Sequence, residues 1–227
     1  MFVLLPLAPG QYSLLAGILT LLIFSTGGVF SARRTNLEKH AFITGYLVIA
    51  LTFISGGLLP VEDSIPAANF SYQYYEACDF YTVNMKSALL TCTGFFLSLS
   101  LEFLIRHSTR KRVNLIEFPL IICFALFFML LLASSFNLFG GYVSLEGLTF
   151  SLYILAGMNY TSQNSLESGM KYFCLGTLSS GFLLFGVALV FLITKTLNFL
   201  ELRLIFFLLE DLPLLLSFAL IFIFFGF

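Results

Sequence analysis

Seven long apolar blocks run through this chain, and no other feature constrains its fold as strongly. A helix needs about 20 mostly apolar residues to cross a bilayer, and backbone groups in hydrocarbon must be satisfied within the segment. The blocks therefore predict an all-α integral membrane protein with about seven transmembrane helices. They cover about residues 11–30, 42–60, 84–105, 117–135, 138–157, 169–193 and 211–227. A short interfacial helix is expected over 197–209, where Glu201 and Arg203 interrupt the apolar sequence.

Charged residues are scarce and unevenly placed. Only 10% of the 227 residues are charged, against about 25% in soluble domains, so no soluble catalytic domain fits. Basic residues gather in the loops after the first and third spans, whereas acidic residues fill the loop after the second. Positively charged loops stay on the cytoplasmic or matrix side, which predicts an N-terminus on the opposite side. The formal net charge of -1 gives no sign of nucleic-acid binding.

The cysteines Cys78, Cys92, Cys123 and Cys174 are scattered singly, without the paired spacing of a zinc or iron–sulfur site. The last three lie in apolar blocks, and we expect them to be small buried hydrophobic residues. The chain has 29 Phe and no Trp, a bias typical of AT-rich coding such as that of organellar genomes. Its first residues lack the basic segment and cleavage site of a secretory signal, so we expect the first helix to be retained.

A carboxyl group lies near the middle of the fifth span. Placing Glu146 in hydrocarbon costs about 3 kcal/mol or more, so its side chain should face protein or water and have a partner. Tyr142, Thr149 and Tyr153 stand at offsets of −4, +3 and +7 from it. These spacings predict a polar stripe that points into the bundle. Two roles fit Glu146: a proton carrier, or a neutral hydrogen-bonded link between two helices.

Two lysines also lie within predicted spans. Lys171 is near one end of the sixth span, in a helix whose many small residues imply close packing and leave less freedom to snorkel. Lys86, at the start of the third span, is expected to be an interfacial anchor. Glu117 precedes Pro119 in the first turn of the fourth span, where both residues favour the start of a helix.

The run from Asn114 to Ile193 resembles subunit 2 of proton-pumping NADH:ubiquinone oxidoreductase, respiratory complex I. The resemblance is carried by NLIEFPLII, LLASSFNLFGGYVSLEGLTFSLYILAG and SLESGMKYFCLGTLSSGFLLFGVALVF, and more loosely by ITKTLNFLEL. About a third of the chain carries the strong match, and the part before it fits as three expected helices.

The resemblance implies an antiporter-like bundle of about fourteen helices with inverted repeats, of which this chain would form the first half. Residues 1–113 would supply three N-terminal transmembrane helices, and 114–227 the start of the antiporter-like core. Glu146 would be the family's fifth-helix glutamate and would tune the proton affinity of Lys171, its sixth-helix lysine. The chain would thus serve proton translocation as a non-redox subunit without a catalytic centre, cofactor or metal, with FMN, iron–sulfur clusters and ubiquinone held by other subunits.

The family carries a further lysine in a broken seventh helix, and this sequence stops at Phe227, where that lysine is due. We therefore expect the N-terminal half of a split mitochondrial subunit in the inner membrane, completed by a second polypeptide that starts near the missing lysine. Other complex I membrane subunits and phospholipids would surround it. Two alternatives stay open: a subunit of a multisubunit cation/proton antiporter, and a structural remnant that scaffolds the membrane arm without pumping.

Overall fold

The computed structural model describes residues 80–107, 117–159, 162–208 and 214–227. The helices within them are α4 (Phe80–His107), α5 (Glu117–Ser134), α6 (Leu138–Ala156), α7 (Gln163–Thr194), α8 (Phe199–Leu208) and α9 (Leu214–Gly226). Of the described helices, α5, α6 and α7 are long and apolar enough to cross a membrane. The all-α membrane fold is thereby confirmed. The spans expected at 11–30 and 42–60, the basic loops that predict the orientation, and Cys78 lie outside the described residues.

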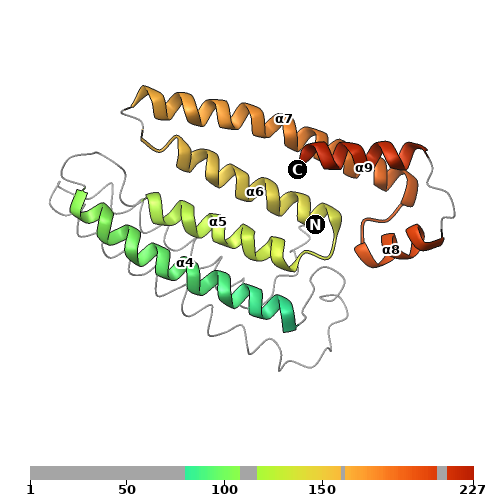
Figure 1. The fold of residues 1–227 in the computed structure, drawn as a ribbon, viewed down its shortest axis with the longest axis horizontal. Coiled ribbons are helices and arrows are strands. Elements are labelled where there is room, and N and C mark those ends of the chain that lie inside the picture. The colour runs from blue at the N-terminus through green and yellow to red at the C-terminus, as the bar shows by residue number, and fades with distance from the viewer. Residues whose placement is uncertain (1–79, 108–116, 160–161, 209–213) are drawn as a thin grey trace, which may run out of the picture.

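The long helices lie side by side in the order of the chain (Figure 1). α4 packs on α5, α5 on α6 and α6 on α7, and α9 folds back along the C-terminal half of α7 (Figure 1). Short connections force consecutive helices to run antiparallel. α8 lies off this row, beyond the C-terminal end of α7.

Most helix boundaries agree with the predicted spans within a few residues, but α7 begins at Gln163 rather than near 169. The added first turns are polar, and hydropathy alone therefore leaves them out of the span. The backbone of Ser162 is extended at the N-cap of α7. α8 confirms the short helix expected over 197–209, and Asn198 caps its start by accepting a hydrogen bond from the Leu200 N–H at 3.2 Å.

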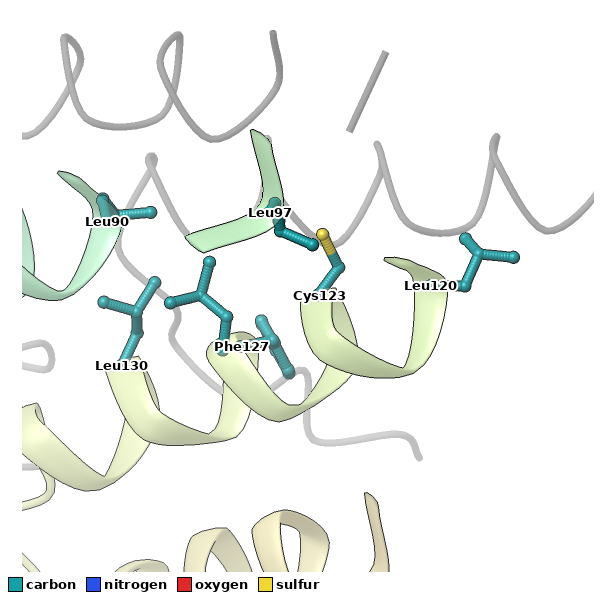
Figure 2. Close-up of a cluster of buried hydrophobic side chains, with 7 residues drawn as sticks. Leu90, Leu97, Leu120, Cys123, Phe127 and Leu130 are labelled. Carbon is teal, nitrogen blue, oxygen red and sulfur yellow. The ribbon is translucent and has the colours of Figure 1, made fainter. Parts of the chain in front are cut away.

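Apolar side chains fill the seam between α4 and α5, as Figure 2 shows. Lipid is as apolar as leucine, so such a seam is held by close van der Waals packing rather than by release of water. The buried cluster consists of Leu90 and Leu97 from α4 and of Leu120, Cys123, Leu126, Phe127 and Leu130 from α5.

The burial expected for three cysteines is confirmed for Cys123, which is 3% exposed. It is wrong for Cys92 and Cys174, which lie on exposed faces of α4 and α7. Every face of a membrane helix can be apolar, so an apolar block does not reveal which of its faces packs against protein.

The expectation of an interfacial anchor at Lys86 is also wrong, because this side chain is 1% exposed. Lys86 precedes Leu90 by four residues and Leu97 by eleven, which places all three on one side of α4. Both leucines belong to the buried cluster shared with α5. Lys86 thus lies on the packed side of its helix.

Two turns are joined at one end of the bundle. Asn137, between α5 and α6, forms an antiparallel bridge with Asn198, between α7 and α8. The Leu138 N–H donates to the Leu197 carbonyl oxygen at 2.9 Å. Asn137 also accepts from the Phe139 N–H at 3.1 Å and so caps α6. These bonds tie the start of α6 to the end of α7.

Glycine permits the close approach of α9 to α7. A Cβ atom on Gly186 would lie 2.9 Å from the backbone nitrogen of Ile223 and 3.0 Å from the carbonyl oxygen of Ala219. Backbone atoms cannot move aside as a side chain can, so this seam requires glycine. Around Gly181, on the same helix, nothing lies within 4 Å of such an atom.

We therefore expect Gly186→Leu to separate α9 from α7 at a cost of about 1–3 kcal/mol, the usual range for overpacking. The variant should show a lower midpoint in thermal unfolding of the detergent-solubilised protein. Gly181→Leu is the matched control and should behave as the wild type. Equal stability of the two variants would show that the α7–α9 contact is not rigid.

Candidate functional site

The seam between α6 and α7 is built from small residues and one aromatic side chain. A Cβ atom on Gly169 would lie 3.0 Å from the Cα atom of Gly157. Further along the seam, the Tyr153 ring lies over Gly176, in the space that a side chain there would need. Small residues let the backbones of membrane helices approach closely. The approach sets the register in which the other residues of α6 and α7 meet.

Tyr153 is buried in this seam and packs edge-on against two rings of α7. Its ring centroid lies 4.8 Å from that of Tyr172 and 5.7 Å from that of Phe173. Edge-to-face pairs of this kind add about 0.5–1.5 kcal/mol each beyond the area they bury. Tyr153 therefore locks the register that the glycines allow.

Glu146 lies in the same seam, two turns of α6 before Tyr153. Its side chain is half-buried, and the Ser180 hydroxyl of α7 donates a long hydrogen bond of 3.5 Å to its Oε1 atom. The prediction that Glu146 and Tyr153 face the bundle is thus confirmed by their contacts with α7. The next residue, Gly147, contacts α5 instead, because the Phe128 ring of α5 packs against it.

Lys171 forms an ion pair with Glu167 that was not predicted from the sequence. Its Nζ atom lies 2.5 Å from Oε1 of Glu167, one turn earlier on α7. The two side chains are 70% and 63% exposed in the isolated chain. Glutamate four residues before lysine is the favoured order for such a pair on a helix. The spacing was present in the SLESGMK motif and could have revealed it.

The structure does not bring Glu146 and Lys171 together. Ser180, which meets Glu146, follows Lys171 by nine residues, or about 13 Å of helix rise. At about 100° per residue, Lys171 also points to the side of α7 opposite the seam residues Gly169, Phe173 and Ser180. Direct tuning of Lys171 by Glu146, as the family resemblance implied, does not fit this arrangement. Two separate polar positions flank α7 instead.

Within the described helices, no group of three or more His, Cys, Asp or Glu side chains is placed to hold a metal ion. Helices α6 and α7 offer carboxyl, ammonium and hydroxyl groups, and such groups can carry, release and relay protons.

Residues 135–227 match the family model described as "NADH:quinone oxidoreductase/Mrp antiporter, TM". Subunit N of NADH-quinone oxidoreductase from Bartonella bacilliformis is 35% identical over 185 residues, which cover 82% of this chain and 35% of the relative. The subunit N of Granulibacter bethesdensis is 30% identical over 191 residues, covering 83% of this chain and 36% of the relative. The chain spans about a third of the length of these curated relatives.

Two solved structures share the fold. A chain of respiratory complex I from Thermus thermophilus with bound aureothin has a TM-score of 0.66 at 22% identity, covering 96% of this chain and 42% of that one. A chain of the membrane-bound sulfane sulfur reductase, an archaeal respiratory membrane complex, has a TM-score of 0.67 at 20% identity, covering 95% and 44%. Membrane chains of respiratory complexes therefore share the helix arrangement seen here.

The Tyr153 contacts give a test of the α6–α7 register. Tyr153→Ala removes the ring from the seam and should cost about 3–5 kcal/mol, as for other buried aromatic residues. Tyr153→Phe keeps the ring and should retain most of the stability. The check is thermal unfolding of the detergent-solubilised protein. A Tyr153→Ala variant as stable as Tyr153→Phe would contradict the register described here.

Proposed function

We propose that this chain, a homologue of subunit N whose residues 135–227 match the NADH:quinone oxidoreductase/Mrp antiporter family, contributes to proton translocation across a coupling membrane. The translocation would be driven by electron transfer from NADH to a quinone in other subunits. On this proposal the chain is a non-redox, multi-pass part of an enzyme complex. Flavin, iron–sulfur clusters and the quinone site would then belong to its partners.

The observation that carries the proposal is a half-buried carboxyl group in the middle of an apolar helix. Glu146 lies in α6, one of the helices long enough to cross the membrane, and meets Ser180 of α7. An ionisable side chain at this depth is costly and usually marks an ion or proton pathway. The long hydrogen bond from the Ser180 hydroxyl compensates only weakly for burial of this carboxyl group, which favours a role in proton movement over a purely structural link between two helices.

The rest of the bundle is part of the proposal. Relatives extend well beyond the stretch that this chain matches. Large apolar side chains also remain exposed on the described helices, among them Leu175 and Phe185 of α7 and Phe224 of α9. Contiguous apolar faces of this kind pack against lipid or further protein. We propose that the missing family helices cover part of them, supplied by a second polypeptide in the mitochondrial inner membrane.

Mass spectrometry of the intact complex tests this assembly. We expect two polypeptides that together account for the length of subunit N, the second beginning near the seventh-helix lysine. Cross-links should join it to α7. A single longer polypeptide containing this sequence would refute the split and would leave the proton-translocation proposal untouched.

The two polar positions can be tested by substitution. Glu146→Gln and Lys171→Ala remove an ionisable group, and each should lower NADH-driven proton pumping by about tenfold or more if it carries protons in the rate-limiting path. Assembly should persist, because both changes keep or reduce side-chain volume. The measurement is acidification of inverted vesicles, normalised to complex content.

Thr177→Ala serves as the control, since its exposed hydroxyl bonds only to the Cys174 carbonyl of the same helix among the described contacts. It should pump normally. Normal pumping in both Glu146→Gln and Lys171→Ala would reduce these residues to structural roles and favour the scaffold alternative.

A cation/proton antiporter subunit is the second candidate, because the matching family model covers both kinds of protein. Copurification decides between them. Isolation together with iron–sulfur subunits and NADH-dependent acidification supports the respiratory complex. A complex without redox subunits that exchanges Na⁺ for protons supports the antiporter.

A further inference from the structure

We propose that Glu167 is the positioning residue for Lys171 in proton translocation, acting on the face of α7 that points away from α6. This inference rests on the proposed function. It replaces Glu146 by Glu167 as the carboxylate that acts on Lys171. It also places Glu146 and the Glu167–Lys171 pair on opposite sides of α7.

The ion pair supplies the geometry. Glu167 Oε1 and Lys171 Nζ are 2.5 Å apart and form a charge-assisted hydrogen bond. The two residues are one turn apart, so the backbone of α7 itself sets their spacing. No rearrangement between helices is needed to form or keep the pair.

Glu146 and Tyr153, the other candidate partners for Lys171 among the described residues, are directed elsewhere. Glu146 meets Ser180, about 13 Å further along α7 and on its other side. Tyr153, the titratable residue of α6 nearest in register, packs its ring on Tyr172 and Phe173. Among the described residues, Glu167 is therefore the carboxylate placed to act on Lys171.

A lysine in a membrane helix needs such a partner. Unpaired ammonium groups in hydrocarbon either snorkel to the interface or pair with a carboxylate. Glu167 holds the Lys171 headgroup beside α7, which prevents the long side chain from sampling other positions. Lys171 can then pass one proton from Nζ to an adjacent water and regain one from the other direction, while Glu167 keeps its headgroup in place.

Removal of one partner of this pair can show whether the contact is functional or incidental. In water, an exposed pair at this spacing contributes almost nothing, and its loss would go unnoticed. In a low-dielectric site, loss of one partner leaves the other charge uncompensated. The consequence of removing Glu167 alone therefore reports which environment surrounds it in the assembled membrane.

The experiment compares Glu167→Gln, Glu167→Asp and Ser168→Ala in the intact membrane complex, with Lys171→Ala alongside. Glu167→Gln should lower NADH-driven pumping about tenfold, to the level of Lys171→Ala. Glu167→Asp keeps the charge on a shorter side chain and should pump at a rate between Glu167→Gln and the wild type. Ser168→Ala, an exposed neighbour on α7, should pump normally. The double variant Glu167→Gln/Lys171→Ala should be no worse than either single variant, because the two residues act as one unit.

Normal pumping in assembled Glu167→Gln, with pumping lost in Lys171→Ala, overturns this inference and leaves the proposed function standing. Normal pumping in both variants instead removes Lys171 from the proton path, which refutes that part of the proposed function. If Glu167→Gln does not assemble, pumping by Glu167→Asp tests the inference. Reduced pumping in the assembled Asp variant supports positioning, and wild-type pumping shows that Glu167 has a structural role alone.

Discussion

The close approach of α6 to α7 determines which side chains of these two helices meet. It depends on the absence of side chains at Gly169 and Gly176, because the backbone of Gly157 lies against the first and the Tyr153 ring fills the space beside the second. Helices in lipid gain nothing from expelling water, so such contact is what holds them in one register. Once this register is set, Glu146 must meet Ser180, and the side of α7 that carries Lys171 must face away from α6.

The remaining seams apply the same principle with different residues. α4 and α5 interlock through leucines and Cys123, whereas α9 reaches α7 through Gly186. The bridge between Asn137 and Asn198 joins the turns at one end of the bundle. It pairs backbone N–H and C=O groups that no helix satisfies there. Packing thus positions the middle of each helix, and backbone bonds position its end.

The sequence predicted most helices of this fold because length and hydropathy record the thickness of the bilayer. It failed where a polar turn extends a helix, as at Gln163, and where the packed face of an apolar helix had to be chosen. Lys86 and Cys174 are examples: the first is buried and the second exposed, yet both lie among apolar residues. Periodicity of hydrophobicity reports burial from water, and in lipid that signal is weak.

The candidate site shows the same division. The polar stripe on α6 could be predicted because polar residues in a membrane helix recur on the side that faces protein. The resemblance implied that Glu146 of α6 acts on Lys171, whereas the structure pairs Lys171 with Glu167 of α7. Whether Glu146 can reach Lys171 depends on how α7 is rotated about its axis, and that rotation is set by the Gly157–Gly169 contact and the Tyr153 ring.

A consequence for coupling follows from this rotation. α7 separates the Glu146 position from the Lys171 position, so an electrostatic signal between them crosses a helix diameter of about 10 Å as well as about 13 Å of rise. Two unit charges that far apart interact weakly unless the space between them is dry. Water on either side of α7 therefore weakens any direct coupling. Communication between the two positions then requires movement of α7 relative to α6, and such a movement has to break the Tyr153 contacts that lock their register.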